Sequence, residues 1–242
     1  MIPTWRTGRT PTRDSDTGSD PQDERTVTFL RLGVGLIGIL LPVVLPFGNW
    51  LFAEFRGLGT SGVWPVSMSG SYYTSTRNVF VGSLCALGVF LICYRFDRRD
   101  DRWSTAAGVC AVGVALCPTA PVHATAFRSA VGVVHLVLAA LVYLVLALFS
   151  IVSFRDPHYA RRPWVARGYL TAGLLIPLFL VLAVVASLTH LGADWTVHPV
   201  YLCEWLATWA FGAAWTAAAV ELAATNGAFS HPAVAPAAPA AP

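Results

Sequence analysis

The sequence predicts an all-α, polytopic membrane helix bundle with six transmembrane helices and both termini in the cytoplasm. Of the 242 residues, 55% are hydrophobic and only 12% are charged, about half the charged fraction of an average soluble domain. The apolar residues fall in long blocks, and about 20 apolar residues are needed for a helix to cross a bilayer. Arginines are concentrated in alternate connections between these blocks, as in multi-pass proteins.

The apolar blocks define a six-span bundle over residues 28–223. They cover residues 28–48, 78–95, 103–119, 129–154, 168–189 and 199–223. The first block contains Gly33, Gly35 and Gly38 in a GxGxxG pattern. A dinucleotide site needs this pattern between a strand and an exposed helix start. Because these glycines lie inside an apolar helix, we interpret them as a helix-packing surface.

The two ends of the chain differ from the rest in composition. Residues 1–27 are rich in charged residues, Thr, Ser, Gly and Pro, and predict a disordered cytoplasmic tail. Residues 224–242 run into Ala and Pro and predict a second disordered tail. Neither tail could bury an apolar core.

The arginines predict the orientation in the membrane. All 16 basic residues are Arg, and with the N-terminus inside only Arg56, Arg77 and Arg128 fall in outer segments. The remaining 13, with Arg31 counted among them, fall on the cytoplasmic side, which predicts cytoplasmic termini. No basic stripe is interleaved with aromatic residues, so nucleic acid is excluded as a partner.

Small residues recur at helical spacing in two of the blocks. They are Ala107, Ala111 and Ala115 in the third block and Ala210, Ala214 and Ala218 in the sixth. Such faces let helix backbones approach closely in lipid and predict a compact bundle. The same faces would also permit a homo-oligomer.

Three ionisable residues in the outer half of the bundle are candidates for a site. His135 lies in the fourth block, Glu204 in the sixth, and Arg77 at the start of the second. An ionisable side chain inside a bilayer is costly and is therefore a functional hypothesis by default. We expect these residues to form a ligand-binding site.

The long outer loop, residues 49–77, adds hydroxyl groups to this region. Its candidate ligand-binding residues are Ser67, Ser69, Tyr72, Tyr73, Arg77 and Asn78. A helix start beside an arginine suits an anion, so the phosphate of a lipid headgroup is one predicted ligand and membrane lipids are the predicted partners. In the alternative interpretation, Ser and Thr only cap the helix while Arg77 pairs with Glu204 or interfacial lipid.

Two further functions compete with binding. His123, His135, His190, His198 and Glu204 could supply zinc ligands for a membrane-embedded hydrolase, which needs three fixed ligands and an open water position. No spacing pairs two of these histidines on one helical face, so we predict no metal, no cofactor and no catalytic residue. A small transporter is the third hypothesis, and the count of six spans would allow an inverted repeat of three plus three.

A family resemblance rests on the segments 67–74, 77–82 and 85–91, continued by Tyr94, Gly108 and residues 113–115. These segments resemble a widespread group of uncharacterised bacterial six-span membrane proteins. The sixth block, with Glu204, residues 210–212 and Trp215, looks like the last helix of that group. The resemblance implies a multi-pass protein of the bacterial inner membrane and implies no activity.

The architecture also has more distant similarities. Six spans with a polar first outer loop are similar to the DRAM and Sfk-type membrane proteins, which implies a lipid-linked, non-enzymatic role. The polar outer half is more weakly similar to zinc hydrolases of the alkaline ceramidase type. We therefore expect a binding or regulatory protein, with the metal hydrolase and the transporter as alternatives.

Overall fold

The computed structural model describes residues 21–57, 63–94, 98–121, 123–155 and 162–226 and contains no strand within them. Its elements are α1 (Pro21–Arg56), the 3-10 helix η1 (Ser69–Tyr73), α2 (Arg77–Cys93), α3 (Arg98–Leu116), α4 (Ala126–Leu148), the π-helical turn η2 (Phe149–Ser153), α5 (Pro163–Leu188) and α6 (Pro199–Asn226). Each α-helix coincides with one of the six apolar blocks. The all-α prediction is confirmed.

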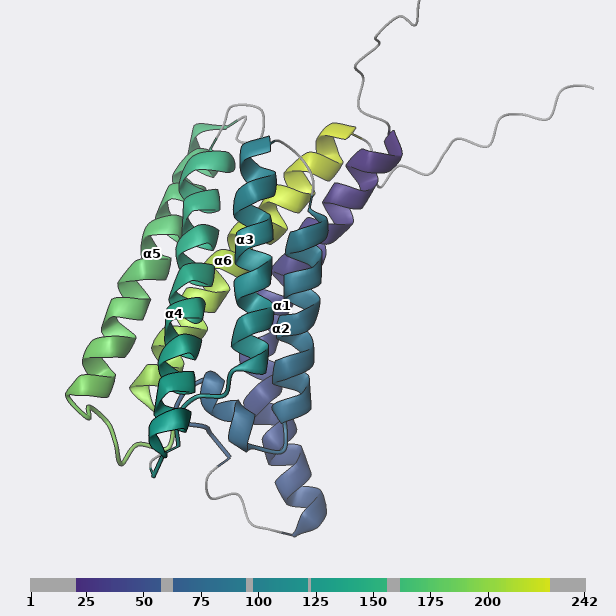
Figure 1. Cartoon of the computed structure of the whole chain (residues 1–242). Coiled ribbons are helices and arrows are strands. Elements are labelled where there is room, and N and C mark those ends of the chain that lie inside the picture. The colour runs from purple at the N-terminus through teal and green to yellow at the C-terminus, as the bar shows by residue number, and fades with distance from the viewer. Residues whose placement is uncertain (1–20, 58–62, 95–97, 122, 156–161, 227–242) are drawn as a thin grey trace, which may run out of the picture.

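The six α-helices form a closed ring that follows the order of the sequence. Each helix packs against its neighbours along the chain, and α6 packs against α1 as well as α5. The start of α1 and the end of α6 lie at the same end of the bundle, which we name the tail end (Figure 1). The opposite, loop end carries residues 63–76, 117–121, 123–125 and 189–198.

The lengths and compositions of the described helices are those of a multi-pass membrane protein. Four are long and apolar enough to cross a membrane: Arg25–Arg56, Ala126–Ser153, Pro163–Leu188 and Pro199–Ala224. Helix α2 is also apolar but has 17 residues. Helix α3 has charged residues throughout its first turn, which lowers its hydropathy.

Both predicted tails are longer than the structure allows. Helix α1 begins at Pro21, so residues 21–27 are helical. Proline is favoured in the first turn of a helix, where its missing N–H costs nothing, and acidic residues are favoured just after it. Helix α6 extends to Asn226, three residues into the other predicted tail. Residues 1–20 and 227–242 lie outside the described residues.

Two glycines of the first helix, Gly35 and Gly38, pack against α6, while Gly33 faces Phe90 of α2. A Cβ on Gly35 would lie 2.3 Å from Oγ1 of Thr216, and one on Gly38 would lie 2.7 Å from the ring of Phe211. Gly212 faces them, because its Cβ would lie 3.0 Å from the carbonyl oxygen of Gly35. The interpretation of these glycines as a close helix-packing surface is confirmed.

The alanine faces pack against other helices of the same chain. Ala107, Ala111 and Ala115 on α3 and Ala214 and Ala218 on α6 are all buried within the bundle. They are therefore committed to packing of the six helices against one another. A homo-oligomer would have to use a different surface.

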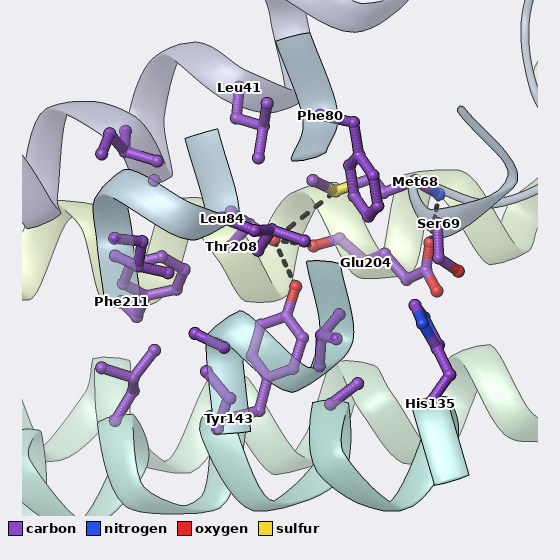
Figure 2. Close-up of a pocket in the computed structure, with 18 of the residues that line it drawn as sticks. Leu41, Met68, Ser69, Phe80, Leu84, His135, Tyr143, Glu204, Thr208 and Phe211 are labelled. Atoms are coloured by element: carbon purple, nitrogen blue, oxygen red, sulfur yellow. Dashed lines mark hydrogen bonds between the residues drawn. The ribbon is translucent and has the colours of Figure 1, made fainter. Parts of the chain in front are cut away.

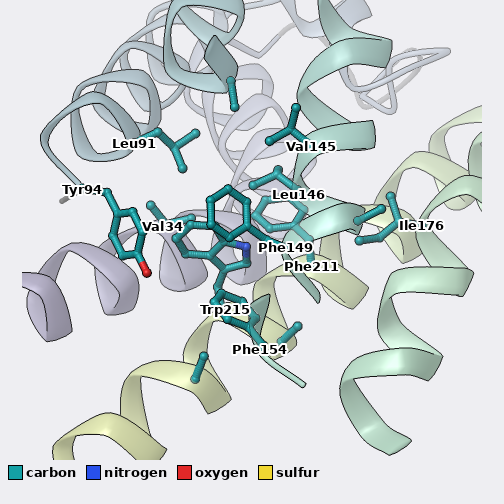
Figure 3. Close-up of a cluster of buried hydrophobic side chains, with 14 of the residues drawn as sticks. Val34, Leu91, Tyr94, Val145, Leu146, Phe149, Phe154, Ile176, Phe211 and Trp215 are labelled. Atoms are coloured by element: carbon teal, nitrogen blue, oxygen red, sulfur yellow. The ribbon is translucent and has the colours of Figure 1, made fainter. Parts of the chain in front are cut away.

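An aromatic core fills the bundle toward the tail end (Figure 3). The ring of Trp215 lies 5.2 Å from the rings of Phe149 and Phe154 and 5.7 Å from that of Tyr94. We refer to these four residues as the aromatic core. Because their side chains are almost completely buried, they close the interior of the bundle on this side.

Arg31 is inside the bundle and not, as its place in the sequence suggested, with the cytoplasmic arginines. Its side chain is 0% exposed. Its Nε donates a hydrogen bond of 3.0 Å to the hydroxyl of Tyr94, and its Cζ lies 5.2 Å from the ring centre of Phe154. A planar guanidinium stacks on aromatic rings and is weakly hydrated, which explains why it can lie there.

Candidate functional site

A cavity of about 100 Å³ lies in the interior of the bundle toward the loop end. A single water needs roughly 10–15 Å³ by this kind of measure, so there is room for several. The lining is mostly apolar and comes from α1, α2, α3, α4, α6 and the loop before η1: Ile37, Gly38, Leu41, Met68, Ser69, Phe80, Leu84, Leu87, Ala111, Val114, His135, Leu136, Ala139, Val142, Tyr143, Leu146, Glu204, Thr208 and Phe211.

Polar side chains gather at one end of this cavity. Figure 2 shows Glu204, His135 and Ser69 close together at that end, with Phe211 toward the other. Helices α4 and α6 both begin at the loop end, at Ala126 and Pro199. His135 and Glu204 each follow within the first three turns, so the two helices present them at a similar depth.

The carboxylate of Glu204 has one hydrogen-bond donor in the protein. Its Oε2 accepts a hydrogen bond of 2.5 Å from the backbone N–H of Met68. Among the described residues no other donor reaches this carboxylate. A carboxylate can accept several hydrogen bonds, so most of its capacity is left for something in the cavity.

His135 is held by the end of α3. Its Nδ1 lies 2.6 Å from the carbonyl oxygen of Cys117, and its side chain is almost fully buried. A carbonyl oxygen only accepts, so Nδ1 carries the proton and donates this hydrogen bond. In the neutral ring Nε2 is then the second hydrogen-bonding atom, and it is an acceptor.

The hydroxyls in the middle of the cavity satisfy each other. The hydroxyl of Thr208 donates a hydrogen bond of 2.6 Å to the backbone carbonyl of Glu204. The hydroxyl of Tyr143 lies 2.7 Å from the hydroxyl oxygen of Thr208. Since Thr208 uses its proton on α6, Tyr143 donates to Thr208. These two residues therefore stabilise the contact between α4 and α6, and the unsatisfied polar capacity is at the Glu204 end.

Residues 63–76 close the cavity at the loop end, and we name them the plug loop. Met68 is 5% exposed and Ser71 is 0% exposed, so the plug loop packs into the bundle. Asn49 ties it to the end of α1: its Nδ2 donates to the carbonyl of Val63 (2.8 Å), and its Oδ1 accepts from the hydroxyl of Ser75 (2.5 Å). The plug loop covers the cavity at the loop end, and the aromatic core fills the bundle nearer the tail end.

The structure divides the eight residues predicted to bind a ligand. Ser69, His135 and Glu204 line the cavity together. The hydroxyl of Ser67 lies 3.3 Å from that of Ser69 and accepts from the N–H of Gly70, so it stabilises η1. The remaining residues lie elsewhere: Tyr72 and Tyr73 line a separate groove, and Arg77 and Asn78 are exposed at the start of α2.

Arg77 does not pair with Glu204. Its guanidinium lies over the ring of Tyr72, 4.5 Å from the ring centre, and donates a hydrogen bond of 3.3 Å to the Tyr72 hydroxyl. The capping expected from Ser and Thr is also absent at this helix, because Thr76 makes no side-chain capping hydrogen bond. The carboxylate of Glu204 instead uses a backbone N–H, which no pattern of side chains could reveal.

Three contributors to the site were missed from the sequence. Tyr143 and Thr208 are polar residues inside apolar helices, and that signal could have identified them. Met68 contributes its backbone N–H and its sulfur, which lies 3.6 Å from the hydroxyl of Thr208. Nothing in its residue type indicates this role.

The zinc hypothesis finds no set of ligands in the structure. Among the residues described, no three His, Cys, Asp or Glu side chains are grouped so that they could hold a metal ion. His123 is exposed, and His190 lies in the turn after α5 with a φ of 53°. His135 is thus the one histidine of the predicted set that lines the cavity.

Comparison with protein-family models, curated proteins and solved structures gives no match to this chain. The resemblance to the bacterial six-span group therefore stays a prediction from the sequence. The candidate site rests on its own geometry.

Proposed function

We propose that this protein binds one small ligand with a polar head and an apolar body in the central cavity, as a binding or regulatory protein of the membrane. The observation that carries the proposal is the carboxylate of Glu204, which has a single donor among the described residues and lies at one end of a mostly apolar cavity. Ligand sites are commonly apolar with a few polar groups that fix orientation. His135 and Ser69 complete that polar end.

The chemistry of the polar end selects the head of the ligand. A carboxylate only accepts hydrogen bonds, and Nε2 of a neutral His135 does the same. A head that donates several hydrogen bonds, such as a primary amine, therefore suits this end best. A carboxylic acid would bring a second negative charge next to Glu204 and is disfavoured.

We also propose that all six helices cross the bacterial inner membrane, with both termini cytoplasmic. In support, α2 and α3 complete the ring between α1 and α4, and the described ends of the chain lie together at the tail end. Exposed arginines favour that end, where Arg25, Arg155, Arg162 and Arg167 lie. This topology puts the cavity in the outer half of the membrane.

The other two hypotheses have less support. A metal hydrolase lacks a ligand set in the described part of the chain. A transporter needs a route from the cavity to the tail end, and the aromatic core occupies that route. Binding without transport is the simpler account of a cavity whose path to the tail end is filled by packed side chains.

The test is thermal unfolding of the detergent-purified protein with butylamine, butanol or butyrate. We expect butylamine to raise the melting temperature most and butyrate least. Glu204→Gln should remove the preference for the amine, whereas Glu54→Gln, which changes an exposed carboxylate at the loop end of α1, should keep it. Equal responses to all three compounds in the parent protein would refute the proposal.

A further inference from the structure

A second concave site lies on the surface of the loop end, separate from the cavity. It is a groove of about 510 Å³ between η1, the end of α3 and the start of α4. Its lining residues are Tyr72, Tyr73, Leu116, Cys117, Pro118, Thr119, Phe127, Arg128 and Val131. The segment 117–119 separates it from the cavity, since the carbonyl of Cys117 is bound by His135 on the cavity side.

The groove is held in place by a contact between the plug loop and α3. The hydroxyl of Tyr73 donates a hydrogen bond to the carbonyl of Thr119, in the connection that follows α3. Tyr72 packs edge-on against Tyr73, with ring centres 5.7 Å apart. One wall of the groove is therefore a fixed aromatic pair.

Arg128 gives the groove its charge. It is the sole charged residue among those that line the groove. Within the part of the chain that the structure describes, its backbone N–H bonds to Thr125 while its guanidinium has no hydrogen bond, ion pair or ring contact. Arg77 lies on the ring of Tyr72 and adds a second positive charge nearby. The groove is complementary to an anion.

The remaining walls are apolar and open. Leu116 is 67% exposed and Phe127 is 78% exposed, and both face the groove beside Arg128. A free anion would gain nothing from these side chains. A molecule that carries a phosphate next to a hydrocarbon chain would use both parts of the groove, because the guanidinium binds phosphate oxygens and the chain covers the exposed apolar area.

We propose that this groove binds one anionic phospholipid, with the phosphate at Arg128 and an acyl chain against Leu116 and Phe127. The lipid comes from the membrane leaflet at the loop end. The site is independent of the small-ligand cavity, since it shares no polar side chain with it. It also moves the lipid headgroup from Arg77, where the sequence suggested it, to Arg128.

The test is native mass spectrometry of the full-length protein, titrated with phosphatidylglycerol or phosphatidylcholine of identical acyl chains. We expect the first phosphatidylglycerol to bind roughly tenfold more tightly than phosphatidylcholine, because the choline cation of phosphatidylcholine offsets the phosphate charge that Arg128 would bind. Arg128→Gln should remove that difference. Arg56→Gln is the matched control, because Arg56 is also exposed at the loop end but lies over the ring of Phe52 outside the groove.

Three results would overturn the proposal. The first is equal binding of both lipids by the parent protein, and the second is an unchanged preference in Arg128→Gln. The third is an equal loss in Arg56→Gln, which would indicate a general surface effect. A fourth result would also reject the lipid: glycerol phosphate, which has no acyl chains, binding as tightly as phosphatidylglycerol would assign the groove to a free phosphate anion.

Discussion

The hydroxyl of Tyr201 on α6 donates a hydrogen bond of 2.8 Å to the carbonyl of Pro42 on α1. In a regular helix that carbonyl would accept from the N–H of residue 46, but residue 46 is a proline and has none. Tyr201 therefore replaces a missing backbone hydrogen bond from the side. Nearby, Nε1 of Trp209 donates to the carbonyl of Ile39 (2.9 Å), three residues before Pro42. Helix α6 thus supplies the donor that the carbonyl of Pro42 lacks within α1.

This relationship predicts a coupling between Tyr201 and Pro46. Tyr201→Phe alone leaves the carbonyl of Pro42 without a donor and should lower the free energy of unfolding by about 1–2 kcal/mol. In a Pro46→Ala background the new N–H can bond to that carbonyl, so the same change should cost much less. A double-mutant cycle of unfolding in mixed micelles measures the difference. Equal costs in both backgrounds would contradict the interpretation.

The contact between Glu204 and Met68 predicts different effects of two substitutions at one position. Glu204→Gln keeps an oxygen that can accept from the N–H of Met68 and should fold with nearly the stability of the parent. Glu204→Leu leaves that N–H without an acceptor and should lose about 1–3 kcal/mol. Thermal unfolding without ligand separates the two. If the Leu variant is more stable than the parent and binds the same ligands, the contact with Met68 does not stabilise the fold and Glu204 does not bind the ligand.

The close approach of α1 and α6 predicts that replacing glycine by alanine destabilises the protein at this contact but not elsewhere. Gly35→Ala places a Cβ 2.7 Å from the backbone nitrogen of Thr216, which cannot move aside, and should destabilise the protein by about 1–3 kcal/mol. At Gly82 in α2 a Cβ would meet nothing within 4 Å. Gly82→Ala should therefore stabilise the helix by up to about 1 kcal/mol. Melting temperatures that shift in the same direction would disprove the packing argument.

The buried guanidinium predicts that lysine cannot replace arginine at position 31. Both Nε and one terminal nitrogen of Arg31 donate to the hydroxyl of Tyr94, and its flat face lies against Phe154. A lysine has neither two nitrogens that can bind one hydroxyl nor a planar group that can stack on a ring. Arg31→Lys should therefore lower the free energy of unfolding by about 1–3 kcal/mol. Arg25→Lys, at an exposed position on the same helix, is the control and should be neutral. Similar melting temperatures for both variants would argue against this role.

Much of the fold could be predicted from the sequence, because a helix that crosses a bilayer must consist mostly of apolar residues. All six helices fall where apolar blocks occur, and the glycines of the first block pack as expected. The errors are at the ends of helices. Pro21 starts α1 within a stretch that is polar throughout, where hydropathy carries no signal for a helix.

The candidate site could be predicted only in part. Glu204 and His135 were identified because ionisable groups in apolar helices are rare, and the structure brings them to one cavity. Arg77 was assigned to the same site because it begins the second apolar block on the outer side, whereas its side chain lies against Tyr72. Arg31 was counted with the cytoplasmic arginines because it lies next to a charged tail, and only the folded bundle shows the aromatic rings around it.

The ring of helices also sets the order in which the protein can mature during synthesis. Helix α6 is made last, yet it contributes Glu204 and Thr208 to the cavity and Gly212 to the contact with α1. At the usual rate of translation, α1 waits about 10–30 s for this partner. During that interval its glycine face and the carbonyl of Pro42 lie uncovered in the membrane. The nascent chain therefore acquires its binding cavity only with its final helix.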